Sequence, residues 1–175
     1  GMSAGSQFFR VLVASGGSSC ADAVSNPVNI VVDPAVSISA EPQSTTQCTG
    51  GTQSFSTTGM GTGTLQYQWQ SAAAANGPFN DLTATQNNYT PPGTAPGSNY
   101  YRLILRSANG LCRDTSVVVA ANIIADPVIA TQPAGAVGCG VAATNLNVVA
   151  TGGIGTLTYQ WQSAANAGGP FADIN

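Results

Sequence analysis

Two stretches of the chain repeat each other almost letter for letter. One starts at Leu65 and reads Leu-Gln-Tyr-Gln-Trp-Gln-Ser-Ala, and the other starts at Leu157 and reads Leu-Thr-Tyr-Gln-Trp-Gln-Ser-Ala. Their tryptophans, Trp69 and Trp161, are 92 positions apart (161 − 69). A repeat of this length indicates an array of similar folded units, in which scaffold residues recur in every copy. A catalytic site is usually built once, so recurrence separates scaffold residues from candidate catalytic residues.

The repeat extends beyond the tryptophan segments in both directions. It predicts the C-terminal strands of a truncated unit in residues 1–32, a complete unit in 33–125, and the N-terminal strands of a further truncated unit in 126–175. The chain is therefore expected to be a piece of a longer protein, with Gly1 ahead of Met2 as a cloning scar. The recurring pairs include Arg10 and Arg102, Cys20 and Cys112, Asp22 and Asp114, Asp33 and Asp126, Cys48 and Cys139, Phe79 and Phe171, and Asp81 and Asp173.

The composition narrows the function classes. Charged residues make up 6% of the chain, against about 25% in ordinary soluble domains. A net charge of −3 with four arginines and no lysine argues against nucleic-acid binding, which needs clustered positive charge. Without His or Lys the chain has no common catalytic triad and no Schiff-base site. Polarity supplied by Ser, Thr, Asn and Gln favours a secreted, stalk-like protein over a cytosolic enzyme.

The sequence predicts no direct membrane contact from this chain. No segment approaches the roughly 20 apolar residues that a spanning helix needs. The apolar run 8–14 is interrupted by Arg10 and is too short for the core of a signal peptide. Any export signal or anchor is expected to lie outside this sequence.

Apolar residues alternate with polar ones between frequent turn residues, which is typical of strands. In the tryptophan segment Leu65, Tyr67 and Trp69 share one face, with glutamines on the other. The short run 72–75 before Asn76-Gly77-Pro78 predicts a loop, because one isolated turn does not nucleate a helix. About seven strands are predicted in the complete unit, near 35–40, 52–58, 64–71, 79–83, 87–90, 98–106 and 111–124.

Seven short strands with one central tryptophan strand predict an all-β fold of immunoglobulin-like, Greek-key β-sandwich repeats. Trp69 is then the core tryptophan, and Trp161 is its copy in the third part. Tyr101 takes the place of the corner tyrosine. Phe55 and Leu103 stand where antibody domains carry their two cysteines, so packing of Phe55, Trp69 and Leu103 is expected to replace that disulfide.

At this level the sequence resembles a known group of proteins. The pattern Tyr-Gln-Trp-Gln-Ser, Gly-Pro-Phe-x-Asp, Tyr-Thr-Pro-Pro, Tyr-Tyr-Arg and Asn-Gly-x-Cys is similar to the Ig-like tandem repeats of large surface and adhesion proteins from Bacteroidetes-type bacteria. The resemblance covers residues 8–175. It implies a cell-adhesion or gliding-associated role outside the cell, and its motifs specify the fold far better than the ligand.

The acids favour scaffold roles over chemistry. Six of the seven form repeat-equivalent pairs, which indicates turn and cap positions. The exception is Glu41, which has no acidic partner and cannot form an acid/base pair. Asp33 and Asp126 at the junctions favour plain Asp-Pro turns over calcium sites, because no second acid lies within five residues. The sequence predicts no cofactor, no metal and no catalytic residue.

Cysteines Cys20, Cys48, Cys112 and Cys139 are disulfide candidates, since an exported protein is oxidised. In a sandwich, Cys48 lies at the pole where the unit's C-terminus leaves and Cys112 at the opposite pole. A strand of eight residues spans about 26 Å, whereas the Cα atoms of a disulfide lie within about 7 Å. A staple between neighbouring units is therefore favoured. Free thiols, or another strand order that joins Cys48 to Cys112, remain alternatives.

The truncated end parts suggest partners. Residues 8–32 supply the last strands of a sandwich and 126–175 the first ones, so each leaves an apolar face and an open sheet edge. We expect other copies of the repeat as partners, with strand exchange between molecules that gives a dimer or a filament. One polar face could bind a glycan or a partner strand, but a solvated face with packed aromatic residues is the favoured interpretation. It is formed by Gln66, Gln68, Gln70, Gln160 and Gln162, with Phe79 and Tyr89.

These features together predict a non-catalytic structural or adhesive repeat module of an exported bacterial cell-surface protein, with an unidentified surface ligand. The alternative is an accessory module, such as a glycan-binding one, attached to a secreted enzyme. An exposed aromatic platform or a shallow groove would favour the accessory module. A surface rich in Thr and Gln without a concavity would favour the spacer.

Overall fold

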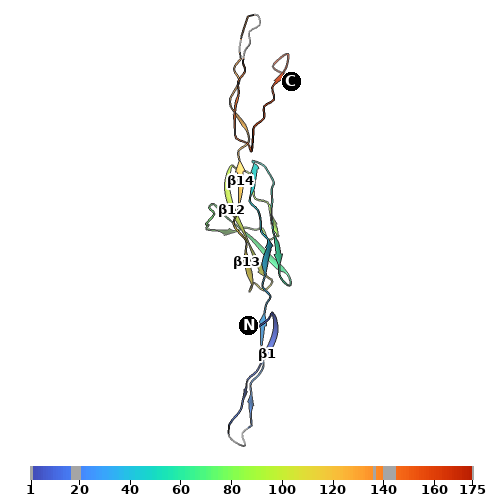
Figure 1. Cartoon of the computed structure of the whole chain (residues 1–175), viewed down its shortest axis with the longest axis vertical. Coiled ribbons are helices and arrows are strands. Elements are labelled where there is room, and N and C mark those ends of the chain that lie inside the picture. Colours follow the sequence, from blue (N-terminus) through green and yellow to red (C-terminus); the bar gives the residue numbers. More distant parts are fainter. Residues whose placement is uncertain (1, 17–20, 136, 140–144, 175) are drawn as a thin grey trace.

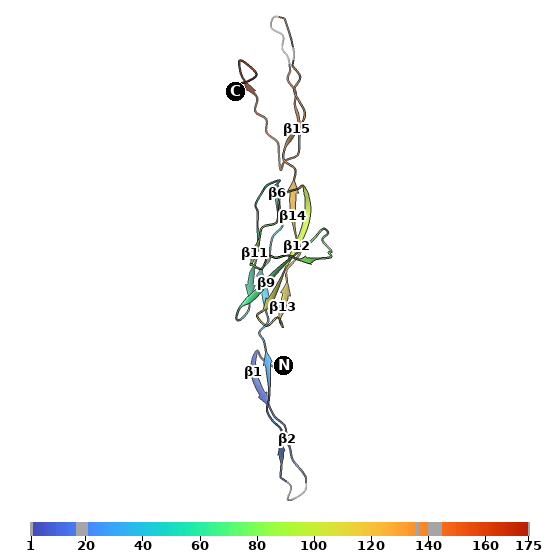
Figure 2. The same cartoon turned by 180° about the vertical axis from the view of Figure 1, so that it is seen from behind.

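The computed structural model describes residues 2–16, 21–135, 137–139 and 145–174. The chain forms a long, narrow molecule in three successive parts, with a β-hairpin at one end, a β-sandwich in the middle and two arms at the other end (Figures 1 and 2). The described residues form strands and turns but no helix, so none of them belongs to a helix that could cross a membrane. The predicted all-β fold is confirmed.

The larger sheet of the middle part has the strand order β10-β9-β12-β14-β6, with β13 also paired to β12. All its pairings are antiparallel except that of β6 with β14, which is parallel. In chain order its strands are β6 (Thr45–Cys48), β9 (Leu65–Ala72), β10 (Asn80–Asp81), β12 (Gly97–Ser107), β13 (Arg113–Thr115) and β14 (Val119–Ile124).

A smaller layer covers one face of this sheet. It consists of two antiparallel pairs, β5 with β8 and β7 with β11. Ile38, Phe55 and Tyr89 from this layer pack against the core residues of β9, β12 and β14. The two layers make the middle part a β-sandwich. The strands of the smaller layer are β5 (Ser37–Ala40), β7 (Phe55–Ser56), β8 (Thr58–Met60) and β11 (Asn88–Tyr89).

Alternation of side chains explains why the central strands lie where they do. In β14 the residues Val119, Ala121 and Ile123 are buried, and the residues between them are only partly covered. The same period of two places Tyr101, Leu103 and Leu105 of β12 in the interior. Neighbouring residues in a strand point to opposite faces, so one face of each strand supplies the core.

Strand β6 departs from the predicted strand positions. Its sequence Thr-Thr-Gln-Cys has no apolar alternation, and pairing with β14, 76 residues later, makes it a strand. The buried Gln47 also accepts a hydrogen bond from the Gln53 N–H through Oε1, at 2.7 Å. The predicted strand 111–124 is interrupted, because the pairing with β12 shifts register between β13 and β14.

The two end parts contain only hairpins and strand pairs. Every strand pairing in the described residues joins strands of the same part, so none crosses the junctions at Asp33 or Asp126. The pairs are β1 with β4, β2 with β3, β15 with β16, and β17 with β18. Their strands are β1 (Gly5–Phe9), β2 (Leu12–Val13), β3 (Ala23–Val24), β4 (Val28–Val32), β15 (Val128–Thr131), β16 (Val149–Thr151), β17 (Gln162–Ser163) and β18 (Ala172–Asp173).

The C-terminal part repeats the pairing of the middle part. Ile38 pairs with Gly59 in the middle part, and Ile129 pairs with Ala150 at the corresponding place, each followed by the same register irregularity. The pairing of β17 with β18 likewise repeats that of β9 with β10. The C-terminal part therefore folds locally like the start of the middle unit. The three-part domain division stays a prediction.

Candidate functional site

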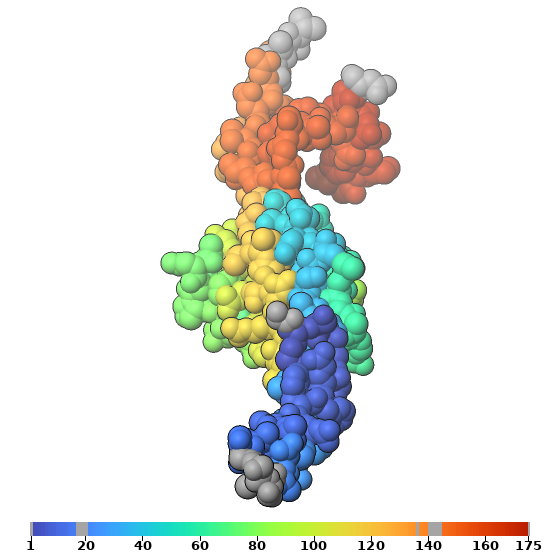
Figure 3. All heavy atoms as spheres, turned by 60° about the horizontal axis from the view of Figure 1, so that its bottom comes forward, coloured from blue at the N-terminus to red at the C-terminus, as the bar shows by residue number. Residues whose placement is uncertain are grey.

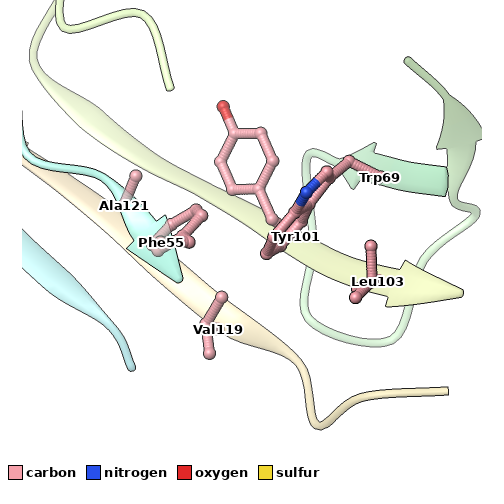
Figure 4. Packing of buried hydrophobic residues seen from close by; sticks show 6 residues of the cluster. All are labelled: Phe55, Trp69, Tyr101, Leu103, Val119 and Ala121. Atoms are coloured by element: carbon pink, nitrogen blue, oxygen red, sulfur yellow. The ribbon is translucent and has the colours of Figure 1, made fainter. Parts of the chain in front are cut away.

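The core of the middle part is an aromatic cluster. Phe55 lies 5.8 Å from the Trp69 ring and 5.3 Å from the Tyr101 ring, measured between centroids. Tyr89 completes the cluster at 5.9 Å from Trp69 and 5.4 Å from Tyr101. Figure 4 shows that Leu103 follows Tyr101 on the same strand and points to the same side. Among the proposed core residues, the structure brings Phe55, Trp69, Tyr101 and Leu103 together.

Burial in this cluster changes the acidity of two phenols. Desolvation raises the pKa of Tyr89 above its ordinary value of 10.0, and desolvation followed by the nearby Tyr89 raises the pKa of Tyr101. A phenol whose pKa is higher in the folded state stabilises the fold, and this contribution is fully present at pH values below the pKa in the unfolded chain. That contribution is lost as the pH rises through the folded pKa values.

We expect the free energy of unfolding to fall above about pH 10 because the buried phenols must ionise. The Tyr89→Phe, Tyr101→Phe double variant should lose less stability over the same range. Urea unfolding at a series of alkaline pH values measures this dependence, with Tyr159→Phe in the C-terminal part as the control. An identical alkaline decline in the wild type and the double variant would contradict the expectation.

A buried serine, Ser116, ties the segment between β13 and β14 to β12. The Leu103 N–H donates to Ser116 Oγ at 2.8 Å, and the Ser116 N–H donates to the Leu103 carbonyl at 2.9 Å. The N-terminal hairpin repeats both bonds between Val11 and Ser25, at 2.9 Å each. We call this arrangement the serine clamp. The sequence analysis did not identify it, although its recurrence is the signal that marks it as scaffold.

Removal of the serine clamp should cost more in the middle part than in the hairpin. Ser116→Ala leaves the buried Leu103 N–H without its acceptor, so we expect a loss of about 1–3 kcal/mol. Ser25→Ala removes the same bond at an exposed place, where water replaces it, and should cost about 0.5 kcal/mol or less. Urea unfolding of the middle part measures the loss in Ser116→Ala, and amide hydrogen exchange in the N-terminal hairpin measures the loss in Ser25→Ala. Equal losses would show that the clamp contributes nothing through burial.

The glutamine face forms hydrogen bonds within the sheet. Gln68 donates to the carbonyls of Trp69 and Leu82, and Gln160 makes the equivalent bonds to Trp161 and Ile174. These amides satisfy backbone carbonyls beside the tryptophan in both copies. The recurrence identifies them as scaffold groups.

A second polar arrangement, which we call the arginine socket, lies beside β10. Gln70 Nε2 donates to Asp81 at 2.7 Å, while Gln70 Oε1 accepts from Arg102 Nε at 2.7 Å. The Arg102 guanidinium lies 4.2 Å above the centre of the Phe79 ring. Stacking on the ring and a hydrogen bond to a fixed amide together hold the arginine. The sequence analysis listed these residues as repeats but did not bring them together.

The acids of the middle part accept hydrogen bonds from the scaffold. Asp114 accepts from the Ile38 N–H at 2.8 Å and so ties β13 to β5. Glu41 accepts from the Val117 N–H at 3.0 Å, and Asp33 accepts from the Asn109 side chain. In the described part of the chain no three His, Cys, Asp or Glu side chains lie close enough to hold a metal ion.

The cysteines of the middle part lie at its two ends. Cys48 pairs with Ile124, where the chain leaves the sandwich, while the Cys112 sulfur lies 4.0 Å from the Asp33 carbonyl oxygen, where the chain enters it. The observed strand order therefore does not bring Cys48 and Cys112 together. Cys48, Cys112 and Cys139 carry free thiols, and Cys20 lies outside the described residues. Among the three described cysteines, the predicted pairing between units is not seen.

The C-terminal part carries an open apolar groove of about 510 Å³. It lies between the hairpin of β15 and β16 and the segment 156–161. Figure 3 shows the hollow between the two arms of this part. Trp161 lines the groove with 37% of its surface exposed, whereas its counterpart Trp69 is fully buried. Trp161 is therefore not a buried core residue here, because no strand of the described residues pairs beside it as β12 pairs beside Trp69.

A comparison with protein families assigns the chain to a family whose description gives no function. The model of a family described as a domain of unknown function, DUF8696, matches residues 37–125. Those residues coincide with the sandwich of the middle part, β5 to β14. No curated protein matches the chain. The match covers half of the sequence, and the chain therefore belongs to the family of the domain of unknown function DUF8696.

Proposed function

We propose that the chain is a non-catalytic structural and adhesive repeat module of an exported bacterial cell-surface protein. The observation that carries the proposal is the recurrence of the same polar contacts in separate parts of the chain. The serine clamp occurs twice, and the glutamine contacts beside Trp69 and Trp161 occur twice. Polar groups that recur in this way serve the scaffold, which favours a structural role over a catalytic one.

The strand arrangement supports the immunoglobulin-like part of the proposal. The tryptophan strand β9 lies beside β12, which carries Tyr101, and β12 lies beside β14. Immunoglobulin-like sandwiches place their C, F and G strands in this order, with a core tryptophan on C and a tyrosine on F. Cys48 and Cys112, at opposite ends of the unit, fit a staple between neighbouring units, and free thiols are the alternative. A disulfide between units and free thiols are both compatible with an extended array of units.

The accessory, glycan-binding module is the second candidate because a groove with two aromatic side chains is present. Tyr159 and Trp161 line that groove. Their counterparts Tyr67 and Trp69, however, lie in a strand that pairs along its length with β12. The groove therefore corresponds to an uncovered core position, and the spacer is the better supported function.

Surface labelling tests the proposed location and role. Antibodies raised against the chain should label intact cells that carry the gene, without permeabilisation. Labelling that requires permeabilised cells would overturn the cell-surface assignment. A glycan panel tests the second candidate, since a glycan-binding module should lose binding on Trp161→Ala, whereas the spacer binds no glycan through that residue.

A further inference from the structure

The two ends of the molecule expose complementary apolar surfaces. At the C-terminal end, the groove is lined by Val128, Ile129 and Leu157 besides the two aromatic residues. At the N-terminal end, the hairpin of β1 and β4 exposes Phe9, Val11 and Ile30. A monomeric soluble protein rarely leaves apolar patches of this kind uncovered on both ends.

The middle part shows how such surfaces fit together. There β9 pairs with β12 over eight residues, with Trp69 opposite Leu103 and Tyr67 opposite Leu105. The segment 157–161 is the counterpart of the first half of β9, yet it forms no strand and has no partner strand among the described residues. In the middle part, β12 takes the place beside this segment's counterpart.

The N-terminal hairpin is that counterpart. Phe9 and Val11 occupy the repeat positions of Tyr101 and Leu103, and the serine clamp between Val11 and Ser25 reproduces the one between Leu103 and Ser116. Phe9 and Val11 are 43% and 56% exposed, whereas Tyr101 and Leu103 are 4% and 0% exposed. The hairpin therefore already contains the serine-clamp hydrogen bonds that are found beside Trp69 in the middle part.

The arginine socket adds a specific polar contact to this fit. Gln162 Nε2 donates to Asp173 at 2.8 Å, which repeats the bond of Gln70 to Asp81. Phe171, the counterpart of Phe79, is 55% exposed. The C-terminal part thus presents a formed socket without an arginine. The arginine that belongs in it by repeat position is Arg10, which is exposed and directly follows β1. Strand β1 lies at the other end of the molecule (Figure 1).

We propose that the groove of the C-terminal part binds the N-terminal hairpin of a second copy of this chain, with Arg10 of one copy in the socket of Phe171 and Gln162 of the other. The two surfaces lie at opposite ends of a long molecule, so one chain does not satisfy itself (Figure 1). In the middle part the chain enters at one end and leaves at the other, so copies joined in this way continue in line. Such a head-to-tail contact is heterologous and gives open chains of copies.

This inference goes beyond the proposed function because it names a partner and does not depend on where the protein resides. The measurement is the molar mass of the 175-residue chain by sedimentation velocity from micromolar to millimolar protein. A reducing agent prevents disulfides from contributing. The mass of the wild-type chain should rise with concentration above the monomer value of 17.5 kDa.

Two variants separate the binding surfaces. Arg10→Gln weakens the hairpin surface and Phe171→Ala weakens the socket, and each should weaken self-association by roughly 10- to 100-fold. When the two variants are mixed, the intact socket of the first meets the intact hairpin of the second. The mixture should therefore form a complex of two chains and stop there. Arg113→Gln, on the exposed strand β13, is the matched control and should associate like the wild type.

Three results would overturn the proposal. One is a wild-type chain that stays monomeric at every concentration. Another is an Arg10→Gln variant that associates as strongly as Arg113→Gln, which would indicate unspecific apolar contact. The third is a mixture of Arg10→Gln and Phe171→Ala whose mass is the average of the two separate samples. Tryptophan fluorescence checks that the middle part stays folded in the Arg10→Gln and Phe171→Ala variants, because neither of these substitutions lies in that part.

Discussion

Trp69→Ala should remove about 3–5 kcal/mol of the stability of the middle part, which is the largest effect expected of a single substitution in this chain. The Trp69 side chain is fully buried and contacts the rings of Phe55 and Tyr89. Its indole N–H donates to the Gln86 carbonyl at 3.0 Å. Truncation therefore leaves a large cavity among aromatic neighbours and also removes a hydrogen bond.

The chain contains its own control for this substitution. Trp161→Ala is the same chemical change at the repeat-equivalent position, where the side chain lines an open groove. It should change the stability of the middle part by about 0.5 kcal/mol or less. Urea unfolding in dilute protein, followed by circular dichroism, compares the two. Similar losses in both variants would refute the assignment of Trp69 as the core and Trp161 as uncovered.

Leu103→Ala is the second large effect and should cost about 2–5 kcal/mol. Leu103 has no exposed surface and lies opposite Trp69 on the neighbouring strand. In the proposed immunoglobulin-like fold, Leu103 takes the place of a cysteine that joins the two layers of antibody domains, so its packing is expected to supply that cohesion. Loss of its side chain removes apolar contacts at the centre of the sandwich.

Leu111→Ala is the matched control for Leu103→Ala. Leu111 lies in the turn between β12 and β13 with 78% of its surface exposed, so the same truncation creates no cavity. We expect a change of stability within about 0.5 kcal/mol. Thermal unfolding of both variants gives the comparison. A Leu103→Ala chain as stable as Leu111→Ala would mean that the two layers are held together elsewhere.

The sequence predicts those parts of the fold that depend on local alternation. The tryptophan strand lies at 65–72 against a predicted 64–71, and the strand of Tyr101 lies at 97–107 against a predicted 98–106. In both strands the apolar face alone decides which side chains turn inward. Trp69, Tyr101 and Leu103 could be named as core residues for that reason, and Phe55 could be named from the place that the immunoglobulin-like pattern gives it.

Other features depend on partners that are distant in the sequence. β6 becomes a strand through its parallel pairing with β14, and nothing in its four residues indicates this. Trp161 shares its sequence context with Trp69 but lies exposed, because burial depends on strands that pack from elsewhere. The arginine socket needs residues from β9, β10 and β12 and Phe79 just before β10. The repeat shows that these residues recur but not that they meet.

Amide hydrogen exchange measures whether the two end parts are complementary halves of the sandwich in the middle. In dilute protein we expect slow exchange in β9 and fast exchange in 157–161. At concentrations where copies associate, 157–161 and the hairpin strand β1 should become protected together. Protection of 157–161 in the dilute monomer, or its continued fast exchange at every concentration, would contradict the account.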